Sequence, residues 1–140
     1  MTQYSFLDSY IGIPYDHYGD GYEATNCYSL IRRIFKEQRG IDLPDWALDD
    51  TDIKTVIRSL QRHIREEIKN RVAMPVLNGD RRDWDIVTVE RNSGPHHIGI
   101  YIANGILHAD RGYGSRWEPL YQFEYAYSGS KFRWWRWPCV

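Results

Sequence analysis

The side chains in this sequence that are best suited to catalysis are a cysteine and three histidines. Cys27 lies in the stretch EATNCYSLIRRIF, whereas His96, His97 and His108 come much later, in HHIGIYI and GILHA. A nucleophilic cysteine needs a base, normally a histidine distant in sequence, and that histidine needs a third polar group to orient it. These residues therefore indicate acyl transfer through a thiol, provided that the fold brings them together.

The position of Cys27 leaves two interpretations open. Thr25 or Asn26 can cap a helix whose first turn contains Cys27, and there the backbone N–H groups and the helix dipole favour a thiolate. In a working pair with a histidine, we expect the pKa of Cys27 to lie below its ordinary value of about 8.5 and its thiol to alkylate faster than that of Cys139. Alternatively, Cys27 lies on the apolar stripe of its helix and acts only as a small buried hydrophobe.

The three histidines lie in or beside predicted strands. In HHIGIYI the alternation puts His97 on one strand face with Gly99, which leaves room for a backbone or a substrate to approach. His108 ends GILHA after the turn ANG, so a hairpin would bring it within reach of His97. Three histidines and a cysteine could instead bind zinc, but adjacent His96 and His97 would point to opposite faces of a strand. We therefore expect no metal and no other cofactor.

Two helices and several strands are predicted to position these side chains. Apolar residues recur at steps of three and four from Cys27 to Phe35, where Gly40 can close the helix, and again from Thr51 to about Arg71. Later stretches alternate or run apolar between breakers and indicate antiparallel strands: WDIVTVE, HHIGIYIA, GILHA and KFRWWRW. Helices followed by strands predict an α+β domain in which the first helix packs on one face of the sheet.

The bulk composition fits one domain that spans residues 1–140. An apolar content of 42% supports a folded core, and a net charge of -1 gives no electrostatic reason to expect nucleic acid or an anionic membrane as a partner. No segment approaches the roughly 18 consecutive apolar residues of a membrane span. The two cysteines, Cys27 and Cys139, form no metal-binding spacing, and no secreted-scaffold pattern supports a disulfide between them.

Four stretches, in order along the chain, resemble the motifs of the NlpC family of papain-like cysteine peptidases, which cut the stem peptides of bacterial cell walls: IPYDHYGDGYEATNCYSLIRRIF, WDIVTV, HIGIYIANG and ILHAD. The likeness spans roughly residues 11–110, and ordered agreement of several motifs is far more specific than any single one. It implies a small papain-like fold, with the nucleophile helix packed on an antiparallel sheet that carries both histidines. The compact versions found in tailed phages are the most similar, because LIRRIFKEQRGIDLPDW resembles the helix and turn that follow their cysteine.

The resemblance implies a role for each matching residue. Cys27 would be the nucleophile, His97 the base and His108 the polar group that orients it, while Tyr15 would line the cleft beside the oxyanion site. The implied reaction is hydrolysis of the amide between D-γ-glutamate and a diamino acid in the peptidoglycan stem, by acyl transfer to water and without a cofactor.

Departures from the family pattern concern the walls beside the nucleophile. Asn26 replaces the usual Asp before the cysteine, Tyr28 and Ser29 replace the Ser-Gly after it, and Trp84 replaces the glycine before Asp85. In family members that bind a free stem-peptide amine, the Asp and the Ser help to form the ammonium pocket. With Asn26 and Tyr28 in the substrate site, we expect a neutral wall that suits stems still attached to the glycan. Asn26 can equally serve as the helix cap, and both roles can coexist.

The expected location follows from the likeness to phage proteins and from the start MTQYSFLDSY, which lacks a signal-peptide pattern. We expect a tail-tip component of a phage virion, made in the host cytoplasm, with the peptidoglycan stem and other tail-tip proteins as partners. Two alternatives stay open. One is a non-catalytic structural tail-tip protein, for which KFRWWRWPCV offers a docking surface, and the other is a papain-like amidase or acyltransferase with another substrate.

Overall fold

The computed structural model describes residues 3–44, 53–77 and 79–137 of the chain. A 3₁₀ helix (Ser5–Tyr10) precedes α1, and a π-helical turn (Phe35–Arg39) follows it. The α-helices are α1 (Cys27–Ile34), α2 (Ile53–Lys69) and α3 (Leu120–Ala126). The strands are β1 (Met74–Pro75), β2 (Ile86–Arg91), β3 (Gly94–Ile102), β4 (Gly105–Asp110), β5 (Gly114–Pro119) and β6 (Lys131–Arg136).

The first helix begins at Cys27 because Asn26 caps it. Asn26 has an extended backbone, and its side-chain oxygen accepts a hydrogen bond from the backbone N–H of Ser29, one of the donors that a helix start leaves without a partner. The helix ends after its π-helical turn at Gly40, whose φ of 65° is a left-handed conformation that glycine adopts without strain. The cap therefore fixes Cys27 as the first helical residue.

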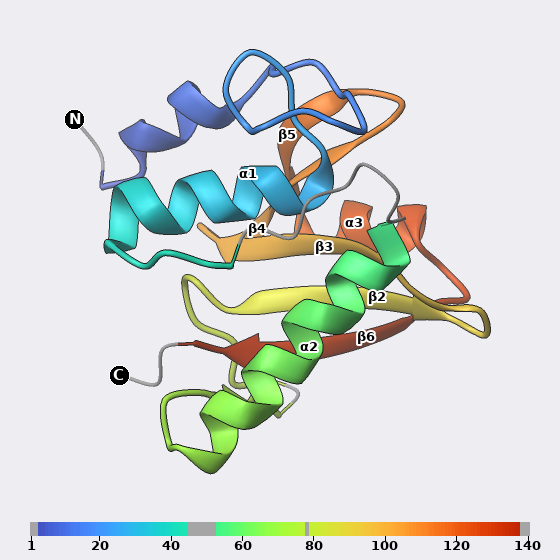
Figure 1. Cartoon of the computed structure of the whole chain (residues 1–140). Coiled ribbons are helices and arrows are strands. Elements are labelled where there is room, and N and C mark those ends of the chain that lie inside the picture. Colours follow the sequence, from blue (N-terminus) through green and yellow to red (C-terminus); the bar gives the residue numbers. More distant parts are fainter. Residues whose placement is uncertain (1–2, 45–52, 78, 138–140) are drawn as a thin grey trace.

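The six strands form one antiparallel sheet in the order β1-β6-β2-β3-β4-β5. Helices α1 and α2 lie on one face, where α1 contacts β3 and β4 and α2 contacts β3, and α3 packs on β4 and β5 from the other face (Figure 1). Successive side chains of a strand point to opposite faces, and both faces are covered, so β2 and β4 contain runs of consecutive buried residues. The sheet thus has a buried layer on each side.

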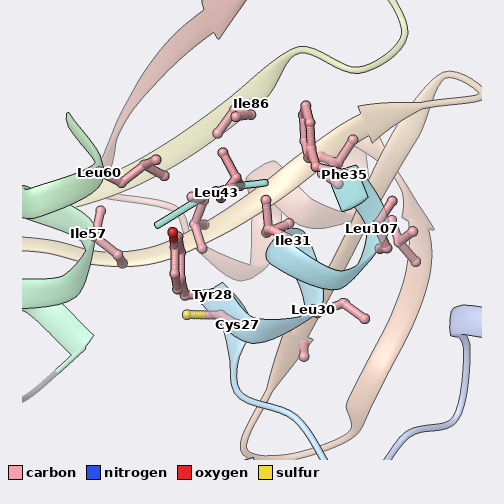
Figure 2. Close-up of a cluster of buried hydrophobic side chains, with 14 of the residues drawn as sticks. Cys27, Tyr28, Leu30, Ile31, Phe35, Leu43, Ile57, Leu60, Ile86 and Leu107 are labelled. Carbon is pink, nitrogen blue, oxygen red and sulfur yellow. The ribbon is translucent and has the colours of Figure 1, made fainter. Parts of the chain in front are cut away.

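Two apolar clusters fill these layers. The larger one joins α1 and α2 to the sheet, and Figure 2 shows Cys27 and Tyr28 within it, beside Leu30 and Ile31. The smaller one lies on the α3 side and consists of Val76, Val87, Val89, Ile106, Phe123 and Trp134. Complete burial of side chains such as Ile31 and Ile98 typically contributes about 1.5–3 kcal/mol each, so α1 is firmly attached to β3.

The pairing between β3 and β4 ends just before the candidate histidines. The ladder runs from the Ile102–Gly105 pair to the Ile100–Leu107 pair. Beyond this ladder, His97 of β3 and His108 of β4 contact each other through their side chains, which lie on the face of the sheet that α3 covers. A methyl group added at Gly99 would lie 2.6 Å from Ile106 Cγ2 and 3.3 Å from His108 Cβ, so the space beside Gly99 is already occupied by β4. Gly99 therefore admits a neighbouring strand that carries His108.

The sequence-based expectation of an α+β domain, with the Cys27 helix packed on an antiparallel sheet, agrees with this architecture. The first helix, the second helix and the four predicted strands are all present, whereas β1, β5 and α3 were not predicted. Cys139 and the start of the predicted second helix, Thr51, lie outside the described residues. Within the described ranges, no helix is long and apolar enough to cross a membrane.

Replacement of Gly99 by alanine tests the close approach of β3 and β4. Because the new methyl group would overlap Ile106, which is fully buried, we expect Gly99→Ala to lower the free energy of unfolding by about 1–3 kcal/mol. Urea denaturation followed by circular dichroism measures this change. The matched control is Gly112→Ala, whose methyl group would meet only Asp110 Oδ1 at an ordinary 3.6 Å and should change stability by less than about 0.5 kcal/mol. Equal stability of the two variants would contradict the proposed packing.

Candidate active site

A cleft of about 240 Å³ contains both Cys27 and His97. Its walls come from the loop before α1, the starts of α1 and α2, β3, the end of β4 and the residue that ends α3. The lining residues are Tyr15, Cys27, Ile53, His96, His97, Ala109, Asp110, Arg111 and Tyr127. A wider hollow of about 710 Å³ lies at the β2–β3 turn, but its described walls contain no cysteine or histidine. The smaller cleft is therefore the candidate active site.

Cys27 is 2% exposed, and burial raises the pKa of its thiol to about 12. The backbone N–H groups of Ile98, Cys27 and Tyr28 act in the opposite direction, because they favour the thiolate, but the loss of hydration is the larger effect. This result corrects the expectation that the helix start would lower the pKa of Cys27. A helix dipole is a modest effect, whereas complete burial of an anion is a large one.

His97 is the base candidate, and it reaches its partners from the α3 side of the sheet. Its Nε2 lies 2.8 Å from Nδ1 of His108, and Nε2 of His108 lies 2.8 Å from Oε1 of Glu118. Burial, and next the positive charge that His108 can carry, hold the pKa of His97 well below its ordinary value. His97 is therefore a neutral imidazole in the free protein near pH 7, and its Nδ1 is the nitrogen that His108 does not engage.

Two aromatic side chains, Phe123 of α3 and Tyr127 just after its end, pack on this histidine pair. The Tyr127 ring stacks on His97 with centroids 4.8 Å apart, and the Phe123 ring meets His108 edge-on at 4.9 Å. These contacts restrict rotation of both imidazole rings and keep water away from them. Burial also raises the pKa of Tyr127, which stays a neutral phenol over the whole working range.

His96 shares the cleft with His97, although neighbours on a regular strand point to opposite faces. Val89 pairs with His97 and Glu90 pairs with Pro95, so His96 is the extra residue of a β-bulge. Bulges change the direction of a side chain, which explains why the expectation of opposite faces was wrong here. Both ring nitrogens of His96 are buried and have no hydrogen-bond partner among the described residues. Among these residues, no group of three or more His, Cys, Asp or Glu side chains could hold a metal ion.

Tyr15 is held next to the start of α1 by backbone hydrogen bonds. Tyr15 forms a parallel bridge with Thr25, the N–H of Thr25 donates to Pro14 O at 2.9 Å, and the N–H of Asp16 donates to Thr25 O at 3.0 Å. Burial raises the pKa of the Tyr15 phenol, so its hydroxyl remains a hydrogen-bond donor. Asp110 and Arg111 add one charge of each sign to the cleft.

The side chains of Asn26 and Tyr28 do not line this cleft. Both polar atoms of Asn26 are engaged within the protein, because Oδ1 accepts from Ser29 N–H and Nδ2 donates to the carbonyl oxygen of His17, each at 2.8 Å. The Tyr28 hydroxyl donates to the carbonyl oxygen of Pro44 at 2.6 Å. For Asn26 the structure favours the capping role over the substrate role. It brings together Tyr15, Cys27, His97 and His108, as the motifs suggested.

Sequence reasoning missed the residues that surround the histidine pair. Leu120, Phe123 and Tyr127 follow one another at steps of three and four after Pro119, a helical pattern that could have revealed α3. Glu118 had no such signal, because its contact with His108 depends on the register of β4 and β5.

Comparisons with known proteins agree with this geometry. Residues 12–127 match the model of the NlpC/P60 family. Among solved structures, the NlpC/p60 domain of the peptidoglycan hydrolase SagA has a TM-score of 0.58 and 14% sequence identity, over 95% of this chain and 97% of that chain. This likeness confirms the expected papain-like α+β fold. No curated protein matches the chain.

The neutral state of His97 predicts a pH dependence of stability. Because the pKa of His97 in the folded chain is depressed, its contribution is present above the unfolded value of 6.5 and is lost as the pH falls through the folded value. Between pH 7 and pH 5, we expect the free energy of unfolding to fall more steeply in the wild type than in His97→Gln, by up to about 1.4 kcal/mol per pH unit.

Urea unfolding at several pH values measures this difference. His63→Gln is the matched control, because His63 is half-buried on α2 and does not line the cleft. If the free energy of unfolding changed with pH equally in the wild type and in His97→Gln, the burial of a neutral His97 would be contradicted.

Proposed function

Because the chain belongs to the NlpC/P60 family, as its motifs predicted, we propose that it is a cell-wall cysteine peptidase in which Cys27 is the nucleophile and His97 the base. The name of the structural neighbour, a peptidoglycan hydrolase, supports the same class of substrate. The observation that carries the proposal is the shared cleft of Cys27 and His97, with the far nitrogen of His97 bound to His108.

The reaction starts from a neutral thiol and a neutral imidazole. Nδ1 of His97 takes the thiol proton as the sulfur of Cys27 attacks the amide carbonyl, and the backbone N–H of Cys27 and the Tyr15 hydroxyl stabilise the oxyanion. His97 then gives this proton to the leaving amine, and the C–N bond breaks to leave an acyl-enzyme. Water attacks the thioester with His97 as the base, the acid product leaves, and the thiol is regenerated.

The proposed bond is the amide between D-γ-glutamate and a diamino acid of the peptidoglycan stem. Such a substrate has free carboxylates and an amino group near the scissile bond. Arg111 lines the cleft and can pair with one of these carboxylates, whereas Asp110 already accepts from the N–H groups of Gly112 and Tyr113 and pairs with Arg116. The positive charge of Arg111 supports a substrate that carries a carboxylate near the scissile bond.

Carriage by a phage tail tip, with other tail-tip proteins as partners, is a further part of the proposal. Its support is the likeness of LIRRIFKEQRGIDLPDW to the compact tailed-phage members of the family. Production in the host cytoplasm and delivery to the wall at infection would then bring the enzyme to its substrate.

Zymography on purified cell walls tests the peptidase proposal. We expect clearing by the wild type and a loss of roughly 10³-fold or more in Cys27→Ala and His97→Ala, because each removes a group that the acyl transfer needs. His63→Ala removes a histidine that does not line the cleft and should retain clearing. Circular dichroism confirms that each variant is folded.

The soluble products identify the bond. Mass spectrometry should find fragments that end in D-glutamate and fragments that begin with the diamino acid. Muramyl sugars freed from an intact peptide would indicate an amidase instead. Folded wild-type protein that clears no wall and forms no acyl-enzyme would favour the structural tail-tip alternative.

The virion location is tested on purified particles. In the phage whose genome carries the gene, we expect quantitative mass spectrometry to find the chain at a constant ratio to known tail proteins across independent preparations. Particles that lack the chain, or a gene outside any phage genome, would contradict the tail-tip placement without affecting the peptidase proposal.

A further inference from the structure

Glu118 lies directly behind the histidine pair and has no role assigned by any motif. In the register of β4 and β5, Ile106 pairs with Glu118 and His108 pairs with Arg116. Glu118 is thus the diagonal neighbour of His108 on the same face of the sheet, a position from which side chains interact across strands. Its carboxylate reaches the imidazole at 2.8 Å.

The carboxylate is held in place and remains charged. The Glu118 side chain is 9% exposed, and the guanidinium of Arg116 lies 3.6 Å from its second oxygen. Arg116 also reaches Asp110, at 3.4 Å, so the cation is itself anchored between two carboxylates. The hydrogen bond from His108 holds the pKa of Glu118 below its ordinary value, against the opposing effect of burial.

A chain of two imidazoles can hold its protons in either of two directions. A carboxylate accepts hydrogen bonds and donates none, so the Nε2 of His108 that faces Glu118 must carry a proton. In neutral His108, Nδ1 is then an acceptor, and the His97 Nε2 that faces it must carry a proton in turn. Nδ1 of His97 is left without a proton, which is the state that a base for the Cys27 thiol requires.

We propose that Glu118 is a positioning residue that sets the tautomers of both histidines, so that His97 presents an unprotonated Nδ1 to Cys27. This inference rests on the proposed function, because a base is needed only if Cys27 is a nucleophile. It adds a fourth member to the Cys27–His97–His108 series. When His97 accepts the thiol proton and becomes positively charged, the carboxylate of Glu118 also stabilises that charge, with the ring of His108 between them.

The critical variant is Glu118→Gln, which retains the size of the side chain. Arg116 donates hydrogen bonds, so it favours the amide oxygen on its own side and turns the NH₂ group toward His108. An amide N–H there would favour the opposite tautomer of His108, and His97 would then hold its proton on Nδ1. The matched control is Glu124→Gln, the same chemical change at an exposed position of α3.

Imidazole ¹⁵N NMR spectra read the tautomers without any substrate. At pH 8 we expect both His97 and His108 of the wild type to carry the proton on Nε2. In Glu118→Gln we expect this pattern to be lost at both rings, and Glu124→Gln should retain it. Assignment uses the spectra of His97→Gln and His108→Gln. A wild type with the proton of His108 on Nδ1 would overturn the proposal, even if no Glu118 variant could be folded.

Steady-state kinetics on a soluble stem peptide give the second readout. We expect kcat of Glu118→Gln to fall by roughly 10²-fold with KM nearly unchanged, a smaller loss than the ~10⁴-fold seen when a triad carboxylate that contacts its base directly is neutralised. Glu118→Asp keeps an acceptor and should recover part of kcat. A folded Glu118→Gln variant with wild-type tautomers and kcat within twofold of the wild type would overturn the role of Glu118.

These readouts separate the two proposals. Wild-type protein with the expected tautomers but without peptidase activity would contradict the proposed function and leave the tautomer assignment standing. An active wild type with the opposite tautomers would support the proposed function and contradict the role of Glu118.

Discussion

The docking of α1 across β3 and β4 is the contact on which the candidate site depends. The helix packs on these strands through its buried residues, which include Leu30, Ile31 and Ile34. This packing places the start of α1 near the point where the β3–β4 ladder ends. Because Asn26 caps that start, Cys27 is delivered to the opening between the strands, and His97 reaches the same cleft from the opposite layer of the sheet. The apolar contact therefore decides which polar groups meet.

The same burial sets the protonation states of the reacting pair. Removal of Cys27 from water raises the pKa of its thiol to about 12, and burial lowers that of His97, so each group favours its neutral form. A permanent thiolate–imidazolium pair is disfavoured in the free protein. In the proposed reaction, proton transfer is then coupled to attack on a carbonyl carbon, when the developing charge moves from sulfur to an oxyanion that has its own donors. On this proposal, a thiolate forms mainly when a substrate is bound.

Local patterns predicted those features that depend on a short stretch of chain. The cap at Asn26, the two helices and the alternation in HHIGIYI all follow from neighbours in sequence, and the ordered motifs added the family and its fold. Features set by the pairing of distant strands were not predictable. The bulge that turns His96 into the cleft, and the register that puts Glu118 beside His108, depend on how strands align rather than on their composition. The pKa of Cys27 was misjudged because the depth of burial is a property of the whole fold.

A histidine in the third position places a demand on its surroundings that an aspartate would not. A carboxylate can only accept a hydrogen bond from the base, whereas a neutral imidazole can present either a donor or an acceptor. His108 is fully buried between β5 and the Phe123 ring, so water cannot settle this choice. In the proposed arrangement, the charged carboxylate of Glu118, which pairs with Arg116, determines which nitrogen of His108 carries the proton. In the proposed series, the negative charge therefore lies one ring further from the sulfur of Cys27 than that of an aspartate in the third position would, which limits electrostatic repulsion between that charge and the sulfur.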